Sequence, residues 1–183
     1  MGTRGAIGWI LDGEVKAIYN HFDSYPDVLG RKMLDAFNAM QGDLGGWKAK
    51  AKALTFVEGE PTPDDIERLT AMGITPQTVS TGRDWYAWLR NPQGDLLEIL
   101  NMGLAEDGTD FLGDSLFCEY AYLVDFDSNE LVCLKGFNKK EADAWPPAQK
   151  MVTRRNTYHA VSLAGRLAPS STYTDMGDIY FTE

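Results

Sequence analysis

The dipeptide Asp12-Gly13 constrains the fold of this chain more than any other feature. It stands between two runs rich in β-prone residues within residues 4–23. A two-residue type I′ turn needs positive φ at both central positions, and Asp-Gly is among the pairs that tolerate it best. With such a turn, opposed residues have numbers that sum to 25, so Ile10 faces Val15 and Ala6 faces Tyr19. The sequence therefore predicts a β-hairpin over about residues 4–23.

The predicted hairpin has two unlike faces, because side chains alternate between the sides of a strand. One face is mostly apolar and ends in the polar residues Arg4, Tyr19, His21 and Asp23. The other carries Ile7, Trp9 and Leu11 against Lys16, Ile18, Asn20 and Phe22. A register slip of one residue would move His21 to the opposite face, so the polar group depends on the turn.

Several short helices are predicted after the hairpin. Apolar spacings of three, four and seven predict a helix from Pro26 or Asp27 to Met40, with Gly42 as its stop. Residues 42–46 are typical of a flexible turn. Further elements are expected as a helix at 47–54, a strand at 54–57, a capped helix at 62–73, two helices in a tight corner at 84–90 and 94–100, and an acidic loop at 103–114.

Residues 116–135 predict a second hairpin around Asp127-Ser-Asn129, with Tyr120, Tyr122 and Val124 on one face. We expect the two hairpins to form one antiparallel sheet packed against the helices, in an α+β fold. A length of 183 residues suits a single globular domain over 1–183, with a less regular tail from about residue 169.

Charge narrows the range of partners. The chain has 17 basic and 27 acidic residues, a net charge of −10 and a pI of about 4.6. Direct binding to a nucleic-acid backbone is disfavoured, because such binding needs a basic surface. No apolar window of membrane-spanning length and no signal-peptide pattern is visible, so we expect a cytoplasmic protein without a membrane partner. The sequence specifies no oligomeric state.

The sequence indicates neither a cofactor nor a metal. Two cysteines, Cys118 and Cys133, match no zinc pattern and are expected to be reduced and buried. The two histidines, His21 and His159, are 138 positions apart. The acids of residues 103–114 lack the spacing of a calcium loop.

Three stretches resemble a known family. They are T-R-G-A-I-G with D-G and Y-N-H-F-D-S-Y-P-D-V-L-G, then D-W-Y-A-W-L-R with Q-G-D-L-L-E-I-L, then E-Y-A-Y-L-V-D-F-D. Across residues 3–136 the chain is similar to a family of small proteins, without an assigned activity, from tailed bacteriophages and prophages. The resemblance implies a phage or prophage origin, hence the host cytoplasm, and supplies no catalytic residues.

An enzyme is one functional hypothesis. His21 would act as acid or base, oriented by Asp23 or Tyr19, and Arg4 would stabilise an anion. Such a small hydrolase would also need a nucleophile, and neither Thr3 nor Ser24 lies in a recognised nucleophile motif.

The favoured hypothesis is a phage-type accessory protein that acts by binding, for example in counter-defence. It would dock onto a host protein through exposed aromatic residues, or sequester a small polar ligand that is phosphate- or nucleotide-like. For the ligand, Arg4 and His21 would donate hydrogen bonds, Tyr19 or Tyr25 would stack, and Asp23 completes the candidate group.

A purely architectural role for the same group is the alternative. Arg4, His21 and Asp23 would fasten the hairpin to the next helix, with Asp23 or Ser24 as its cap. A minor virion component ranks last, because the chain shows no repeats, coiled coils or extended arms.

Overall fold

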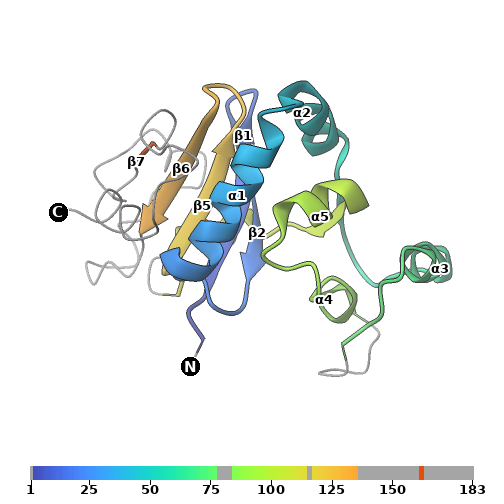
Figure 1. Cartoon of the computed structure of the whole chain (residues 1–183). Coiled ribbons are helices and arrows are strands. Elements are labelled where there is room, and N and C mark those ends of the chain that lie inside the picture. Colours follow the sequence, from blue (N-terminus) through green and yellow to red (C-terminus); the bar gives the residue numbers. More distant parts are fainter. Residues whose placement is uncertain (1, 78–83, 115–116, 136–160, 163–183) are drawn as a thin grey trace.

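The computed structural model describes residues 2–77, 84–114, 117–135 and 161–162. Within them, five strands form the main sheet in the order β2-β1-β5-β6-β7. Their bounds are Gly5–Leu11 (β1), Glu14–Asn20 (β2), Tyr120–Asp125 (β5), Glu130–Lys135 (β6) and Val161–Ser162 (β7). Figure 1 shows helix α1 (Arg31–Met40) lying across one face of this sheet. The α+β fold is the one that the sequence predicts.

Both predicted hairpins are present, and the first has the predicted register. Ala6 pairs with Tyr19 and Ile10 with Val15. The turn residues Asp12 and Gly13 have φ values of 53° and 78°, as a type I′ turn requires. Strands β5 and β6 pair antiparallel around residues 126–129.

The prediction of a single antiparallel sheet is wrong at the junction between the hairpins, because β1 and β5 run parallel. Both hairpin turns therefore lie at the same end of the sheet. The Asp127 carboxylate accepts hydrogen bonds from the backbone N–H groups of Asp12 and Gly13, at 3.0 and 2.8 Å. This contact between the two turns favours the parallel alignment over the antiparallel one.

The main core lies on the sheet face that carries Ile7, Trp9 and Leu11. It is covered by η1 (Pro26–Gly30), α1, α2 (Leu44–Ala53) and α5 (Leu96–Met102). The predicted helix over 26–40 is thus present, although its first five residues form a π-helix. Helix α1 contributes the buried side chains Met33, Leu34, Phe37 and Met40.

The opposite face of the sheet is also covered. Its small residues Ala6 and Ala17 lie in a second buried cluster with Leu112 of the 3-10 helix η2 (Thr109–Gly113). The outer edge of β2 is closed by hydrogen bonds from Gly108 N to the Ala17 carbonyl, 2.9 Å, and from Ala17 N to Thr109 Oγ1, 3.0 Å. A Cβ on Gly108 would lie 2.7 Å from the backbone nitrogen of Tyr19, so this close approach requires glycine.

A third, smaller cluster lies beside the main core. It contains Leu69, Trp85, Trp88, Met102 and Leu104. These residues come from α3 (Pro63–Ala71), α4 (Trp85–Trp88), α5 and β4 (Leu104–Glu106), and β4 pairs in parallel with β3 (Thr55–Val57). Figure 1 shows α3 and α4 farther from the main sheet than α5.

Two local predictions need correction. Residues 42–46 are not a flexible turn, because α2 begins at Leu44 and the Asp43 side chain accepts a hydrogen bond from Gly46 N as its cap. The acidic loop predicted at 103–114 contains β4 and η2, since Leu104, Ala105 and Leu112 are buried. The less regular tail predicted from about residue 169 lies outside the described residues.

Candidate ligand-binding site

The open end of the first hairpin brings Tyr19 and His21 together. The Tyr19 hydroxyl lies 2.8 Å from His21 Nδ1, at hydrogen-bond distance. The Tyr19 ring also packs edge-on against Phe111 of η2, with centroids 4.9 Å apart. The register predicts this pairing, because residues two apart on a strand share a face. Tyr19, rather than Asp23, is therefore the residue that orients the imidazole.

Two arginines add positive charge beside this pair. Burial lowers the pKa of His21, and the charges of Arg90 and Arg4 lower it further. Arg4 is exposed, with its guanidinium 5.5 Å from the ring centre of Phe117. The pair of arginines and a largely neutral histidine form a group suited to receive an anion.

Arg90 was not among the residues that the sequence singled out. It follows α4, and its guanidinium lies over two rings, 5.1 Å from the centre of Phe22 and 5.0 Å from that of Tyr86. It also donates a hydrogen bond to the Tyr86 hydroxyl. The contact with Phe22 joins segments about 70 positions apart, so no local pattern could have indicated it.

Asp23 does not join this group. It is exposed with a left-handed φ of 52°, and among the described residues no hydrogen bond or ion pair connects it to His21. The capping role proposed for Asp23 or Ser24 is also wrong, because η1 begins after Tyr25 without a side-chain cap. The backbone turns left-handed at Asp23, which separates its side chain from the strand alternation that placed it beside His21.

The hairpin end is fastened by a different polar network. Ser24 is fully buried, and its Oγ accepts a 2.8 Å hydrogen bond from Asn20 Nδ2. Its backbone carbonyl accepts a 3.1 Å hydrogen bond from the Tyr122 hydroxyl. Tyr25 is exposed, and its ring lies near Tyr120, with centroids 6.1 Å apart. Tyr25 therefore belongs to the turn into α1 and not to the Tyr19 group.

A cavity of about 220 Å³ adjoins the group formed by Tyr19, His21, Arg4 and Arg90. The sequence patterns did not indicate this cavity. It lies where the main core meets the third cluster, between β2, the α4–α5 corner and β4. Most of its wall is apolar and is formed by Ile18, Leu89, Ile99, Met102 and Leu104.

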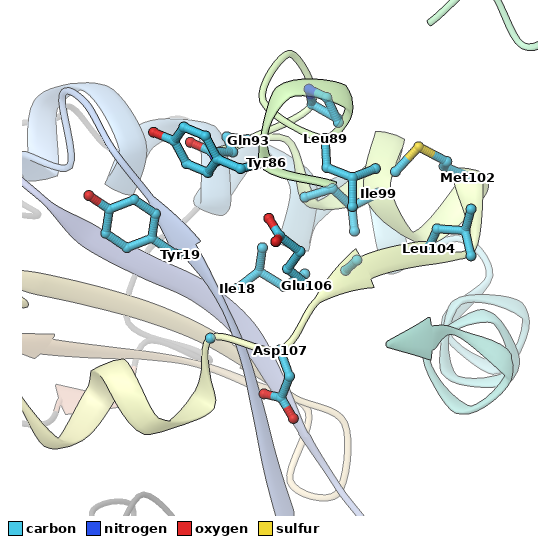
Figure 2. Close-up of a pocket in the computed structure, with 13 residues that line it drawn as sticks. Ile18, Tyr19, Tyr86, Leu89, Gln93, Ile99, Met102, Leu104, Glu106 and Asp107 are labelled. Atoms are coloured by element: carbon cyan, nitrogen blue, oxygen red, sulfur yellow. The ribbon is translucent and has the colours of Figure 1, made fainter. Parts of the chain in front are cut away.

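One side of the cavity is polar. Figure 2 shows Tyr19, Tyr86 and Gln93 gathered at one end, with Leu89, Met102 and Leu104 at the other. Tyr19 and Tyr86 are also members of the group around His21 and Arg90, since the rings of His21 and Tyr86 are 6.4 Å apart. The cavity and the basic group thus share one boundary.

Glu106 brings a carboxylate into this cavity (Figure 2). Burial raises its pKa, and the negative charge of Asp84 raises it further. Across the described part of the chain, its carboxylate has no hydrogen bond or ion pair. A half-buried carboxylate without such a partner costs free energy, which a ligand with hydrogen-bond donors would recover.

The neighbouring Asp107 differs from Glu106 in the direction of its carboxylate, in its partners and in its pKa. Figure 2 shows its carboxylate pointing away from the other labelled side chains. It accepts a 2.9 Å hydrogen bond from Thr109 N and pairs with Lys16 at 3.6 Å. Although burial opposes this effect, the hydrogen bonds of Thr109 and the charge of Lys16 lower its pKa. Of these two adjacent acids, Asp107 has its own partners and Glu106 faces the cavity.

Among the residues that the structure describes, no cluster of three or more His, Cys, Asp or Glu side chains is arranged to hold a metal ion. Over the same residues, no helix has the length and hydrophobicity needed to cross a bilayer. Cys118 and Cys133 are both buried and are not joined by a disulfide, as the sequence predicts.

No family model, curated protein or solved structure matches this chain.

Proposed function

We propose that this protein binds a small ligand composed of a flat, largely apolar ring system and an anionic group, as in a nucleotide. The ring would enter the cavity, and the anion would lie on the group formed by Arg4, Arg90 and His21. The observation that carries the proposal is that Tyr19 and Tyr86 border both places. One ligand could therefore occupy both at once.

The size of the cavity sets the size of the ring. A cavity of about 150 Å³ holds a benzene molecule, and pockets for drug-sized ligands begin at about 300 Å³. At about 220 Å³ this cavity suits one ring system, with the remainder of the ligand outside. The apolar wall would stabilise the ring, and Tyr19 or Tyr86 would pack against it.

The local positive charge of two arginines is the reason for proposing an anionic group in the ligand. The chain is strongly acidic overall, so two arginines beside one opening would attract an anion only locally. Burial lowers the pKa of His21 most, and the positive charges of Arg90 and Arg4 lower it further. Capture of the ligand, rather than its hydrolysis, is favoured because Thr3 and Ser24, the two nucleophiles considered from the sequence, are both buried.

The test is calorimetric titration with guanosine monophosphate and adenosine monophosphate, using the wild type and Arg90→Met. The variant keeps an unbranched apolar side chain in place of the arginine stem and loses the charged guanidinium. We expect it to weaken binding by about tenfold or more, because hydrogen bonds to charged groups contribute about 1.5–3 kcal/mol. Arg31→Met is the matched control, since Arg31 is exposed on α1 and pairs with Asp35 at 3.7 Å.

A second readout is the His21 imidazole, followed by NMR. A bound phosphate would raise the pKa of His21, because a nearby negative charge favours the protonated form. The proposal is overturned if neither nucleotide binds at millimolar concentration, or if Arg90→Met and Arg31→Met behave alike.

Docking onto a host protein is the second proposal. Phe22, Tyr25 and Val28 are large side chains with exposed fractions of 52, 44 and 40% within seven residues of one another. Exposed aromatic side chains are common anchors of protein interfaces. A host protein that co-purifies with the wild type and is lost with Val28→Glu would support docking, and its retention would argue against it.

The resemblance to phage proteins remains a prediction, and it would give either activity a biological setting. A phage protein could act in counter-defence by sequestering a nucleotide-like signal of the host or by blocking a host protein. Purification from infected or lysogenic cells, followed by native mass spectrometry, would detect either the ligand or the partner by its mass.

A further inference from the structure

We infer that Glu106 is the specificity residue of the cavity and that it selects ring systems with two adjacent N–H donors, as on the edge of guanine. The inference rests on the proposed function and deepens it by naming the preferred ligand. It depends on the position of Glu106 and on the chemistry of a carboxylate.

Glu106 is positioned by rigid elements. It is the last residue of β4, which pairs with β3 through the register Val57↔Glu106. Two residues after it, Gly108 is hydrogen-bonded to β2 at Ala17. The backbone is therefore held on both sides of Glu106, which fixes the direction in which its side chain enters the cavity.

The surroundings of Glu106 leave its hydrogen-bonding capacity for a ligand. Tyr19, Tyr86 and Gln93 lie across the cavity from it, and most of the remaining wall is apolar (Figure 2). Asp107 also lines the cavity, but its carboxylate is paired with Lys16. Asp84 contributes negative charge and no attraction. Within the described residues the arginines contact other groups, Phe22 and Tyr86 for Arg90 and Phe117 for Arg4.

A carboxylate has two oxygens that accept hydrogen bonds side by side, so it best fits a pair of neighbouring donors. Guanine offers such a pair in its ring N1–H and its exocyclic amino group. Hypoxanthine keeps the ring N–H and lacks the amino group, whereas adenine presents an acceptor at that ring position. An ionised carboxylate would repel this acceptor, so the three bases form a graded series.

The test uses calorimetric titration of the wild type with guanosine, inosine and adenosine monophosphates. We expect guanosine monophosphate to bind at least about tenfold more tightly than inosine monophosphate, which lacks one donor to a charged group. Adenosine monophosphate should bind more weakly still. This ligand series needs no substitution and remains informative even if a variant fails to fold.

Two variants complete the design. Glu106→Gln preserves shape and replaces one acceptor by a donor, so the preference for guanosine monophosphate over adenosine monophosphate should fall by about tenfold or more. Asp107→Asn is the matched control, because Asp107 also lines the cavity but its carboxylate points away from the other labelled side chains and pairs with Lys16. It should keep the wild-type preference.

The outcomes separate the two proposals. Equal binding of the three nucleotides, or an unchanged preference in Glu106→Gln, would overturn the role of Glu106 and leave the proposed function standing. If none of the three nucleotides binds to the wild type at millimolar concentration, both fail. A lost preference in Asp107→Asn as well would show that overall charge, and not Glu106, sets the specificity.

Discussion

At the scale of single residues, two glycines with positive φ allow the cost of backbone strain to be distinguished from the cost of steric overlap. Gly94 has a φ of 79°, and a Cβ there would lie 2.9 Å from Asn20 Oδ1 and 3.2 Å from Leu29 Cδ1. Gly59 has a similar φ of 67°, with open space around its Cβ position. The pair allows the two costs to be measured separately.

We expect Gly59→Ala to lower the free energy of unfolding by about 1 kcal/mol, from backbone strain alone. Gly94→Ala should lower it by about 2–4 kcal/mol, since overlap adds to the strain. Urea unfolding followed by circular dichroism measures both. Equal losses would mean that Asn20 and Leu29 move aside without cost.

The residues of the candidate site differ in how far the sequence could reveal them. Tyr19 and His21 were predicted together, because hairpin register is a local property of the turn. Tyr86, Arg90 and Glu106 were missed, since their roles arise from contacts between segments far apart in the chain. Asp23 was misplaced because period-two alternation was extended past Asn20, where β2 ends.

At the scale of elements, helix α3 shows how local signals determine structure. Thr62 and Asp65 form a capping box, with Asp65 N donating to Thr62 Oγ1 and Thr62 N donating to Asp65 Oδ2, at 3.2 and 2.9 Å. The hydrogen bonds of Thr62, from its side chain and then its backbone, lower the pKa of Asp65. Capping was predicted from sequence because it needs residues only three apart.

Thr62→Ala should lower the free energy of unfolding by about 1 kcal/mol at neutral pH. The pKa of Asp65 in the folded state is below its ordinary value of 3.8. The stability that ionised Asp65 adds to the folded protein is therefore present above that value and is lost as the pH falls through the folded pKa. The difference between wild type and variant should therefore shrink below about pH 4. Urea titrations at neutral and acidic pH check this, and a difference independent of pH would contradict it.

The elements that were missed are those whose existence depends on distant partners. Strand β4 has three residues and needs β3 beside it, and η2 needs the small residues of β1 and β2 beneath it. The direction of β5 relative to β1 depends on Asp127 meeting the first turn. Each hairpin could be predicted alone, whereas the direction in which the hairpins join could not.

At the scale of the whole molecule, the reactivity of the Cys118 and Cys133 thiols measures how rarely the sheet opens to solvent. Their exposed fractions are 1 and 0%, and burial raises the pKa of the Cys118 thiol above its ordinary value. A thiol reagent should therefore react with the native protein at least about a thousandfold more slowly than with the unfolded chain. The control variants Cys118→Ser and Cys133→Ser assign each rate to one thiol.

Labelling followed by absorbance over a series of urea concentrations measures these rates. Both rates should rise with urea in parallel with global unfolding. A fast, urea-independent reaction at Cys133 would show that β6 separates from β5 without unfolding of the remaining structure.

The parallel pairing of β1 with β5 has a consequence for protein synthesis. Gly5 pairs with Tyr120, which follows it by 115 residues. At about 5–20 residues per second, the ribosome needs roughly 6 to 23 seconds between them. During that interval the first hairpin has emerged, the inner edge of β1 is unpaired and the apolar faces of the hairpin are uncovered. Unpaired strand edges and exposed apolar surfaces are bound by chaperones and promote aggregation. The yield of folded protein should therefore depend on translation rate and chaperone supply more than its final stability suggests.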